Sequence, residues 1–311
     1  MEKSRHDART SPTGHFCESW LESDWNLGKY DHDDIKNRQA RKPRDALQTL
    51  TIAIKERTME IKDHSAIIVG GASGMALATA ELWVEKGGKL AILDLPSSDG
   101  AAVAERLGAT FHPCNVMDYE GTEAAINAAV EQLGGVHFVC NTAGGGLAKR
   151  TVARDGAHPL ADFQRVIDLN LISAFNISRL TAEKMGTNEP NEDGERGVII
   201  NTASIAAFEG QIGQVAYSAA KGGIAAMTLT MARDLGSMGV RVMTIAPSLF
   251  STGITKGIPE AASQNLVKDA AFPKRMGRPI EYAKMAVAIY ENCMMNGSTI
   301  RVDAGVRFAP K

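Results

Sequence analysis

The sequence predicts an α/β fold in which helices cover both faces of a doubly wound parallel sheet. From Ser65 onward, short apolar runs alternate with longer segments of helical character. The runs are apolar at consecutive positions, a pattern that suits strands buried on both faces of a sheet. Alternation of strands and helices with connections of this length implies parallel strands joined by crossovers. We therefore expect one α/β domain without internal repeats.

Each expected strand is a short apolar run, and each expected helix fills the segment between two such runs. Strands are expected at residues 66–69, 90–93, 110–113, 136–140, 197–201, 241–246 and 299–302. Helices are expected at residues 74–86, 119–133, 160–185, 215–238, 260–268 and 280–292. The longest expected loop covers residues 144–159, and a second polar insertion covers residues 186–196.

The first 58 residues differ in composition from the remainder of the chain. They carry many charges, among them Asp31, Asp33 and Asp34, and show no sustained hydrophobic periodicity. Such a composition is typical of loose structure, and its acidic residues are unlike a mitochondrial presequence. Met59 opens a run that reads as the beginning of a domain. We predict an N-terminal extension at residues 1–58 and a single domain at residues 59–311.

Bulk composition excludes several classes of partner. The formal net charge of −2 gives no general attraction to nucleic acid or to an anionic membrane. The four cysteines are widely scattered, as expected for reduced thiols in a cytoplasmic protein. No apolar run approaches the roughly 18 residues of a membrane span, and we expect no signal peptide. His112, His137 and His158 show no ligand spacing, so we expect no metal site.

A glycine-rich turn between the first expected strand and helix indicates a nucleotide site. Gly70, Gly71 and Gly74 would let the backbone approach a pyrophosphate, which the helix N-terminus also attracts. Tight turns recur without ligands, but Asp94 ends the next strand, where a carboxylate takes the ribose hydroxyls of NAD. Asp94 could instead cap a loop. As a ribose ligand it would repel a 2′-phosphate, and Leu95 offers no compensating cation, which favours NAD over NADP.

Tyr217 and Lys221 lie four residues apart, and Ser204 lies thirteen residues before Tyr217. Residues four apart share one face of a helix, so the lysine can stand beside the phenol. A nearby cation favours the phenolate, so we expect Lys221 to lower the pKa of Tyr217 and make it a proton acceptor and donor. A surface tyrosine–lysine pair is the plainer interpretation of this spacing alone. The nucleotide turn upstream favours the catalytic one.

From Met59 to its end, the chain resembles the short-chain dehydrogenase/reductase family. Within it, the chain is most similar to the group of short-chain 3-hydroxyacyl-CoA dehydrogenases, which also oxidise hydroxysteroids. Three runs carry the resemblance: NEPNEDGERG at 188–197, GVIINTASIAAFEGQIGQVAYSAAKGG at 197–223 and MARDLGSMGVRVMTIAPSLF at 231–250. The resemblance implies a single Rossmann-fold domain, usually in a homotetramer.

The resemblance also implies the reaction. The implied reaction is a transfer of hydride between NAD and a 3-hydroxyacyl-CoA, which interconverts a secondary hydroxyl and a ketone. A hydroxysteroid or a secondary alcohol remains open as substrate, because variable loops make the substrate pocket. An NAD-binding scaffold that has lost activity also remains open.

The resemblance assigns individual residues to roles. The catalytic residues are Tyr217 as acid/base, Lys221 as its partner and ribose ligand, Ser204 at the substrate oxygen, and Asn170 beside a proton-relay water. The cofactor-binding residues, besides Tyr217 and Lys221, are Gly70, Ser73, Gly74, Met75, Asp94, Asn115, Val116, Asn141, Thr142, Ala143, Gly144, Pro247, Phe250 and Thr252.

Four positions around the cofactor depart from the family pattern: Val69, Ala76, Asn115 and Ser248. None removes a group needed for catalysis, but an added atom at Ala76 or Ser248 costs about 1–3 kcal/mol if the site is tightly packed.

The segment 250–278 should cover the substrate. Its basic residues either meet the phosphates of a CoA thioester or are solvated surface: Lys256, Lys268, Lys274 and Arg275.

Overall fold

Seven parallel strands form the central sheet of the structure, a computed structural model that describes residues 59–252 and 267–310. The strand order across the sheet is β3-β2-β1-β4-β7-β8-β9. Their bounds are β1 Ser65–Val69, β2 Lys89–Asp94, β3 Thr110–Pro113, β4 Phe138–Asn141, β7 Gly197–Thr202, β8 Val240–Pro247 and β9 Thr299–Val302. All seven expected strands are present, and the predicted doubly wound parallel sheet is confirmed.

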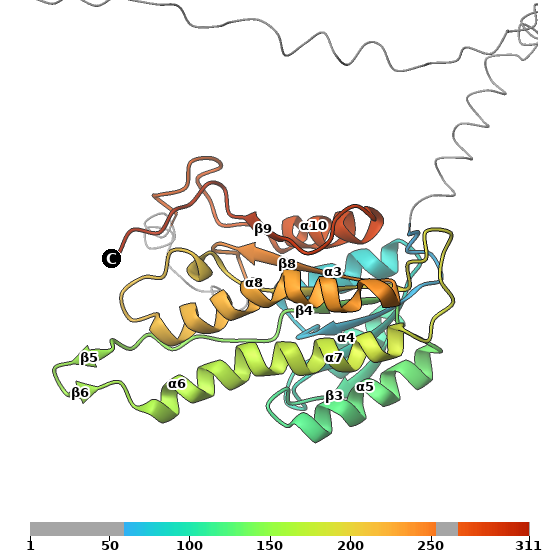
Figure 1. Ribbon diagram of the computed structural model, residues 1–311, viewed down its shortest axis with the longest axis horizontal. Helices are drawn as coiled ribbons and strands as arrows, with labels where there is room; N and C mark the ends of the chain where they lie inside the picture. Colours follow the sequence, from blue (N-terminus) through green and yellow to red (C-terminus); the bar gives the residue numbers. More distant parts are fainter. Residues whose placement is uncertain (1–58, 253–266, 311) are drawn as a thin grey trace, which may run out of the picture. The chain divides into compact units, whose positions relative to one another are not determined.

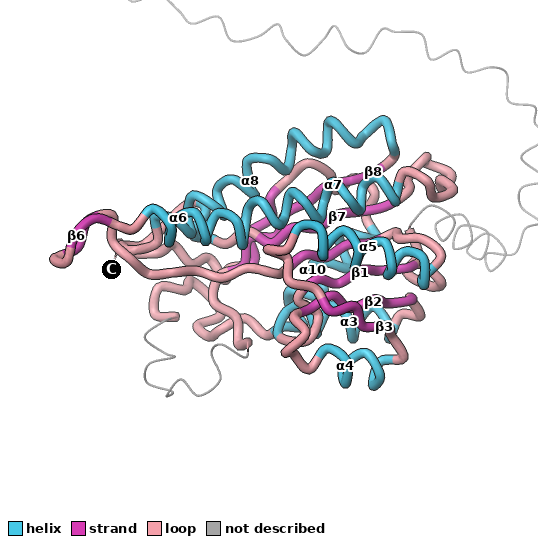
Figure 2. Tube along the Cα trace, turned by 90° about the horizontal axis from the view of Figure 1, so that it is seen from below, coloured by secondary structure: helices cyan, strands magenta, loops and turns pink. Residues whose placement is uncertain are grey.

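Helices cover both faces of this sheet (Figures 1 and 2). One face packs against α3 (Gly74–Glu85), α4 (Gly100–Leu107) and α10 (Pro279–Glu291), which contribute side chains to one hydrophobic cluster. The other face packs against α5 (Tyr119–Leu133), α7 (Ser173–Met185) and the end of α8 (Val215–Leu235). A sheet covered on both sides buries every residue of its central strands, which explains their unbroken apolar runs.

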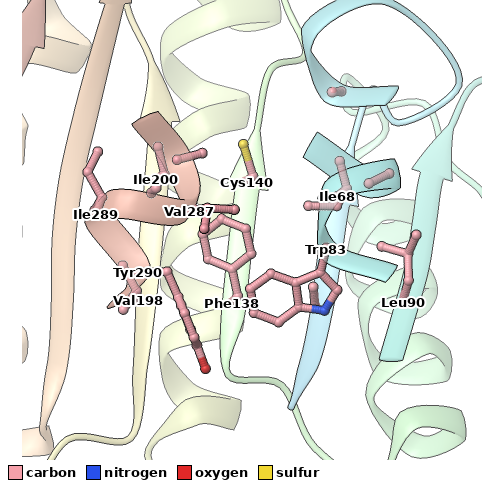
Figure 3. Close-up of a cluster of buried hydrophobic side chains, with 14 of the residues drawn as sticks. Ile68, Trp83, Leu90, Phe138, Cys140, Val198, Ile200, Val287, Ile289 and Tyr290 are labelled. Atoms are coloured by element: carbon pink, nitrogen blue, oxygen red, sulfur yellow. The ribbon is translucent and has the colours of Figure 1, made fainter. Parts of the chain in front are cut away.

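Strand β1 shows how the two cores share one strand. Ile67 and Ile68 are both fully buried, but Ile67 joins the cluster on the α5–α7 face and Ile68 the cluster on the α3–α10 face. On the α3–α10 face, Phe138 stacks on Trp83 with ring centroids 4.7 Å apart (Figure 3). Tyr290 meets both rings edge-on, at centroid distances of 4.8 Å and 5.4 Å. This aromatic group ties α10 and α3 to the middle of the sheet.

Several elements differ from expectation. The expected helix at 160–185 is α6 (Leu160–Ile167), a π-helical turn at Asp168–Ile172, and α7. Helix α4 was missed; it is short and rich in Gly and Ala, and packing of Val103 and Ala104 holds it in place. The expected loop at 144–159 contains a small hairpin of β5 (Val152–Ala153) and β6 (Gly156–Ala157), which projects outward in Figure 1.

In the part of the chain that the structure describes, the remaining short elements are two 3-10 turns, Ile205–Ala207 and Gly236–Met238. The second continues the expected helix at 215–238. Most of the expected helix at 260–268 lies outside the described residues, as does the extension at 1–58, so the domain boundary at Met59 stays a prediction. Within 59–252 and 267–310, no helix is long and apolar enough to cross a membrane. The same residues contain no group of three or more His, Cys, Asp or Glu side chains placed to hold a metal ion.

Candidate active site

A cavity of about 740 Å³ opens at the carboxyl ends of β1, β2, β4, β7 and β8. In doubly wound sheets this edge is where ligands bind, at the point where the strand order reverses. Here that point lies between β1 and β4. The cavity is bounded by all the predicted catalytic and cofactor residues except Asn141, Asn170 and Phe250.

The turn from β1 into α3 fits a pyrophosphate group. Ser73 is the N-cap of α3 with an extended backbone, and its hydroxyl makes no capping hydrogen bond among the described residues. The amides at a helix N-terminus attract anions, and the first turn of α3 contains no acidic side chain to oppose one. Gly74 has φ +57°, and a Cβ there would lie 3.2 Å from the Thr252 side chain. Glycine therefore suits both the backbone conformation and the close packing against Thr252 at this point.

Asp94 ends β2 at the side of the cavity, with its carboxylate fixed by two backbone amides. One oxygen accepts from Ala72 N at 2.9 Å and the other from Leu95 N at 2.7 Å. The first bond joins the end of β2 to the glycine-rich turn. Asn115 and Val116 follow β3 on the same side of the cavity. This arrangement suits a ribose hydroxyl pair at Asp94 and a flat apolar ring beside Val116.

Residues 141–144 carry the end of β4 past the cavity. Asn141 is buried and points into the protein, where its Oδ1 accepts from Ala143 N at 3.1 Å and its Nδ2 donates to Asn201 Oδ1 at 3.4 Å. Its side chain therefore stabilises the turn from inside the protein, while Thr142, Ala143 and Gly144 border the cavity. Phe250 is also buried, with its ring against Gly277, and lies outside the cavity wall.

Helix α8 brings Tyr217 and Lys221 to the cavity, and the turn after β7 brings Ser204. Ser204 and Tyr217 share a side-chain hydrogen bond. The Lys221 side chain is buried, its Nζ donates to Thr202 O at 2.8 Å, and it lies 5.6 Å from the centre of the Tyr217 ring. The three side chains expected to act together are therefore adjacent.

The expectation that the pKa of Tyr217 lies below its ordinary value is wrong for the protein by itself. Burial raises the pKa of Tyr217 above its ordinary value, and the hydrogen bond with Ser204 offsets this rise only in part. Burial also lowers the pKa of Lys221 to about 8. Both side chains lose water around their charged forms, and sequence spacing carries no information about that loss.

Asn170 occupies the centre of the π-helical turn and is fully buried. Its Nδ2 donates to Gly145 O and Val166 O, both at 2.8 Å, and its Oδ1 accepts from Gly145 N at 3.2 Å. The amide thus clamps the segment after β4 to this turn. Single π-helical turns are frequent at functional sites. Asn170 and Lys221 both lie close to Gly144, where an added Cβ would be 2.5 Å from Asn170 Oδ1 and 3.2 Å from Lys221 Nζ.

Several cavity residues were not predicted from the sequence. Arg165 and Leu169 reach the cavity from α6 and the π-helical turn, and Thr202 contributes from the end of β7. The four-residue spacing of Arg165 and Leu169, just before Asn170, is a signal that could have indicated the pair. Thr202 carried no such signal, because its contact with Lys221 uses a backbone carbonyl.

A second cavity, of about 590 Å³, is bordered by the segment 206–218, by Arg150–Val152 and by Pro310. The C-terminal residues hold this segment in place: Ile212 N donates to Pro310 O and Gln211 Nε2 donates to Ala309 O. Arg301 also forms two hydrogen bonds with the carboxylate of Glu209, at 2.7 Å and 2.9 Å. The wall between Ser204 and Tyr217 is therefore fixed by residues almost a hundred positions away.

Comparison with known proteins identifies the family. Residues 64–263 match the family described as short chain dehydrogenase. The 3-hydroxyacyl-CoA dehydrogenase type-2 of Bos taurus is 50% identical over 254 residues, which cover 80% of this chain and 97% of that protein.

Two solved structures share the fold. The crystal structure of 3-hydroxyacyl-CoA dehydrogenase type-2 from Mycobacterium avium is 42% identical, with a TM-score of 0.77. A 7α-hydroxysteroid dehydrogenase complexed with NADH and 7-oxo glycochenodeoxycholic acid is 27% identical, with a TM-score of 0.71. Each comparison covers 80% of this chain and 97% of the other. All the predicted catalytic and cofactor residues lie inside the matched residues 64–263. The chain belongs to the short chain dehydrogenase family of oxidoreductases.

Proposed function

We propose that the chain is an NAD-dependent dehydrogenase that interconverts a secondary hydroxyl and a ketone on a 3-hydroxyacyl-CoA. The observation that carries the proposal is the meeting of Ser204, Tyr217 and Lys221 in one cavity with the turn that precedes α3. A nicotinamide cofactor supplies the hydride acceptor or donor when it is bound there.

The side chains of the protein move and hold the proton. In the direction of oxidation, Tyr217 as phenolate takes the proton of the substrate hydroxyl; in reduction it returns that proton to the oxygen. Ser204 donates a hydrogen bond to the same oxygen, whose charge changes during the reaction. Lys221 in its charged form opposes the effect of burial on Tyr217 and stabilises the phenolate. General acid–base assistance of this kind is worth about 10²–10⁴ in rate.

Preference for NAD over NADP follows from Asp94. Its carboxylate is held at the side of the cavity by Ala72 N and Leu95 N, and we expect its remaining lone pairs to accept hydrogen bonds from ribose hydroxyls. The same negative charge repels a 2′-phosphate.

Three observations favour an acyl-CoA substrate over a small alcohol. Two relatives that match this chain over 97% of their own length carry the name 3-hydroxyacyl-CoA dehydrogenase type-2. The second cavity adds about 590 Å³ beside the segment that joins Ser204 to Tyr217. Arg150 borders that cavity and offers a positive charge. Of the basic residues expected near a CoA phosphate, Arg275 is paired with Glu281, Lys268 and Lys274 are exposed, and Lys256 lies outside the described residues.

We further propose a homotetramer in the cytoplasm. Large apolar side chains are exposed on the outer surfaces of the helices that cover one sheet face, including Ile172, Phe175 and Leu229. Burial of such side chains between copies favours a closed symmetric assembly. The scattered cysteines support a reducing compartment.

Initial-rate measurements test the function. Acetoacetyl-CoA, a 7-oxo steroid and a simple aliphatic ketone are each offered with NADH and with NADPH. We expect the highest kcat/KM for acetoacetyl-CoA with NADH. A higher kcat/KM for the steroid would reassign the substrate. NADH binding without turnover of any ketone would instead support a scaffold.

A further inference from the structure

A chain of buried polar side chains runs from α10 to the back of the active site. Tyr282 lies in the first turn of α10 and is fully buried. Its hydroxyl is 2.7 Å from Thr202 Oγ1 and 3.6 Å from Cys140 Sγ. A buried phenol needs a hydrogen-bond partner, and here that partner is the last residue of β7.

The direction of these hydrogen bonds follows from the acceptors. The Thr202 hydroxyl has one proton, and it donates that proton to Asn141 O at 2.7 Å. Thr202 Oγ1 must therefore accept from the Tyr282 hydroxyl. Burial raises the pKa of Tyr282 well above its ordinary value, so the phenol keeps its proton and can act as this donor.

Thr202 also holds Lys221. Its carbonyl oxygen accepts from Lys221 Nζ at 2.8 Å, and Nζ is in turn 5.6 Å from the Tyr217 ring centre. The hydroxyl and the carbonyl belong to one residue, so the hydrogen bonds that anchor the hydroxyl also restrain displacement of the whole residue, including the oxygen that holds the ammonium. Tyr282 and Asn141 together supply that restraint, each through a hydrogen bond to Thr202 Oγ1.

We propose that Tyr282 is a positioning residue, which through Thr202 fixes the carbonyl that holds Lys221 beside Tyr217 and the cofactor. The inference rests on the proposed function, because it concerns the lysine that serves both catalysis and cofactor binding. Tyr282 itself touches neither substrate nor cofactor, and it is absent from the wall of the cavity.

Tyr290 provides a matched control on the same helix. It is also fully buried, and its hydroxyl is hydrogen-bonded to His64 instead of to an active-site residue. Figure 3 shows its ring beside Phe138. Replacement of either tyrosine by Phe removes one buried hydroxyl from α10, so both changes should cost similar stability. Only the Tyr282→Phe change should reach Lys221.

The experiment compares wild-type protein with Tyr282→Phe, Thr202→Val, Tyr290→Phe and the double variant Tyr282→Phe/Thr202→Val. Each is measured for the Kd of NADH by fluorescence, for kcat and KM with acetoacetyl-CoA, and for Tm. We expect Tyr282→Phe to raise the Kd of NADH about 2- to 10-fold, the equivalent of one net hydrogen bond. We expect kcat to fall by a similar or larger factor while the substrate KM stays within about twofold.

The double variant separates a connected chain from two independent effects. If Tyr282 acts through Thr202, the double variant should bind NADH no more weakly than Thr202→Val alone. The inference is overturned if Tyr282→Phe matches Tyr290→Phe in both Kd and kcat, or if the two single effects add in full. If Tyr282→Phe does not fold, a Thr202→Val protein with unchanged Kd and kcat overturns it equally. Failure of the wild-type protein to bind NADH would overturn the proposed function itself, and this inference with it.

Discussion

Replacement of Gly144 by Ala should displace two groups of the active site at once. The new methyl would lie 2.5 Å from Asn170 Oδ1 and 3.2 Å from Lys221 Nζ. Ordinary contact begins near 3.4 Å, so the Asn170 amide must retreat by about 1 Å. That amide is bonded to Gly145 in both directions, so the segment bordering the cavity must move with it. A misplacement of this size costs about 10²-fold in rate, and we expect kcat to fall by that factor.

Gly156→Ala is the matched control for this variant. Both glycines have positive φ, +157° at Gly144 and +130° at Gly156, so both variants carry backbone strain of about 1–3 kcal/mol. A Cβ at Gly156 meets no atom within 4 Å, and the residue lies in the β5–β6 hairpin. Initial rates with acetoacetyl-CoA and NADH, together with Tm, separate strain from displacement. Turnover by Gly144→Ala within about twofold of the Gly156→Ala rate would refute the reasoning.

Other predictions test the remaining assignments. Tyr217→Phe should keep NADH affinity and lose at least about 10²-fold in kcat, because the hydroxyl that moves the proton is gone; near-normal turnover would reject the mechanism. Asp94→Asn keeps the hydrogen-bond acceptor and removes the charge, so the ratio of NADH to NADPH kcat/KM should fall at least about tenfold; an unchanged ratio would show that the carboxylate does not select the cofactor. Burial, with nearby His64 and Lys89, lowers the pKa of His137 to about 4, so the unfolded chain binds more protons between about pH 4 and 6.5. The free energy of unfolding should therefore drop as pH falls through that window, and His137→Asn should flatten this slope in urea titrations. Light scattering should give a tetramer mass at micromolar concentration, and a monomer mass would contradict the assembly.

The site was predictable where its parts are local in sequence. Gly70–Gly74 forms one turn, and Tyr217 and Lys221 share one helix face, so spacing alone sets their geometry. The strands were predictable because a sheet covered on both sides leaves unbroken apolar runs. Helix α4 was missed because it has only eight residues, fewer than the roughly 10–12 over which a helical pattern can be told from other short segments.

What was missed depends on tertiary packing. The contact of Lys221 with Thr202 joins α8 to β7 through a backbone oxygen, which no side-chain pattern reveals. Arg165 reaches the cavity from α6, which packs against α8 only in the folded chain. The pKa of Tyr217 rises because neighbouring elements exclude water from it. A lysine four residues away indicates a partner, but the sign of the net shift depends on how deeply both are buried.

The bonds from Pro310 and Ala309 to the segment 206–218 matter for anyone who handles this protein. A truncation before these residues, or a reporter fused close behind them, would weaken both bonds and loosen the wall between Ser204 and Tyr217. We expect such changes to alter the substrate KM and to leave the Kd of NADH unchanged, because the nucleotide turn before α3 lies elsewhere. Preparations that differ only in how this tail was treated would then disagree on substrate range and agree on cofactor binding.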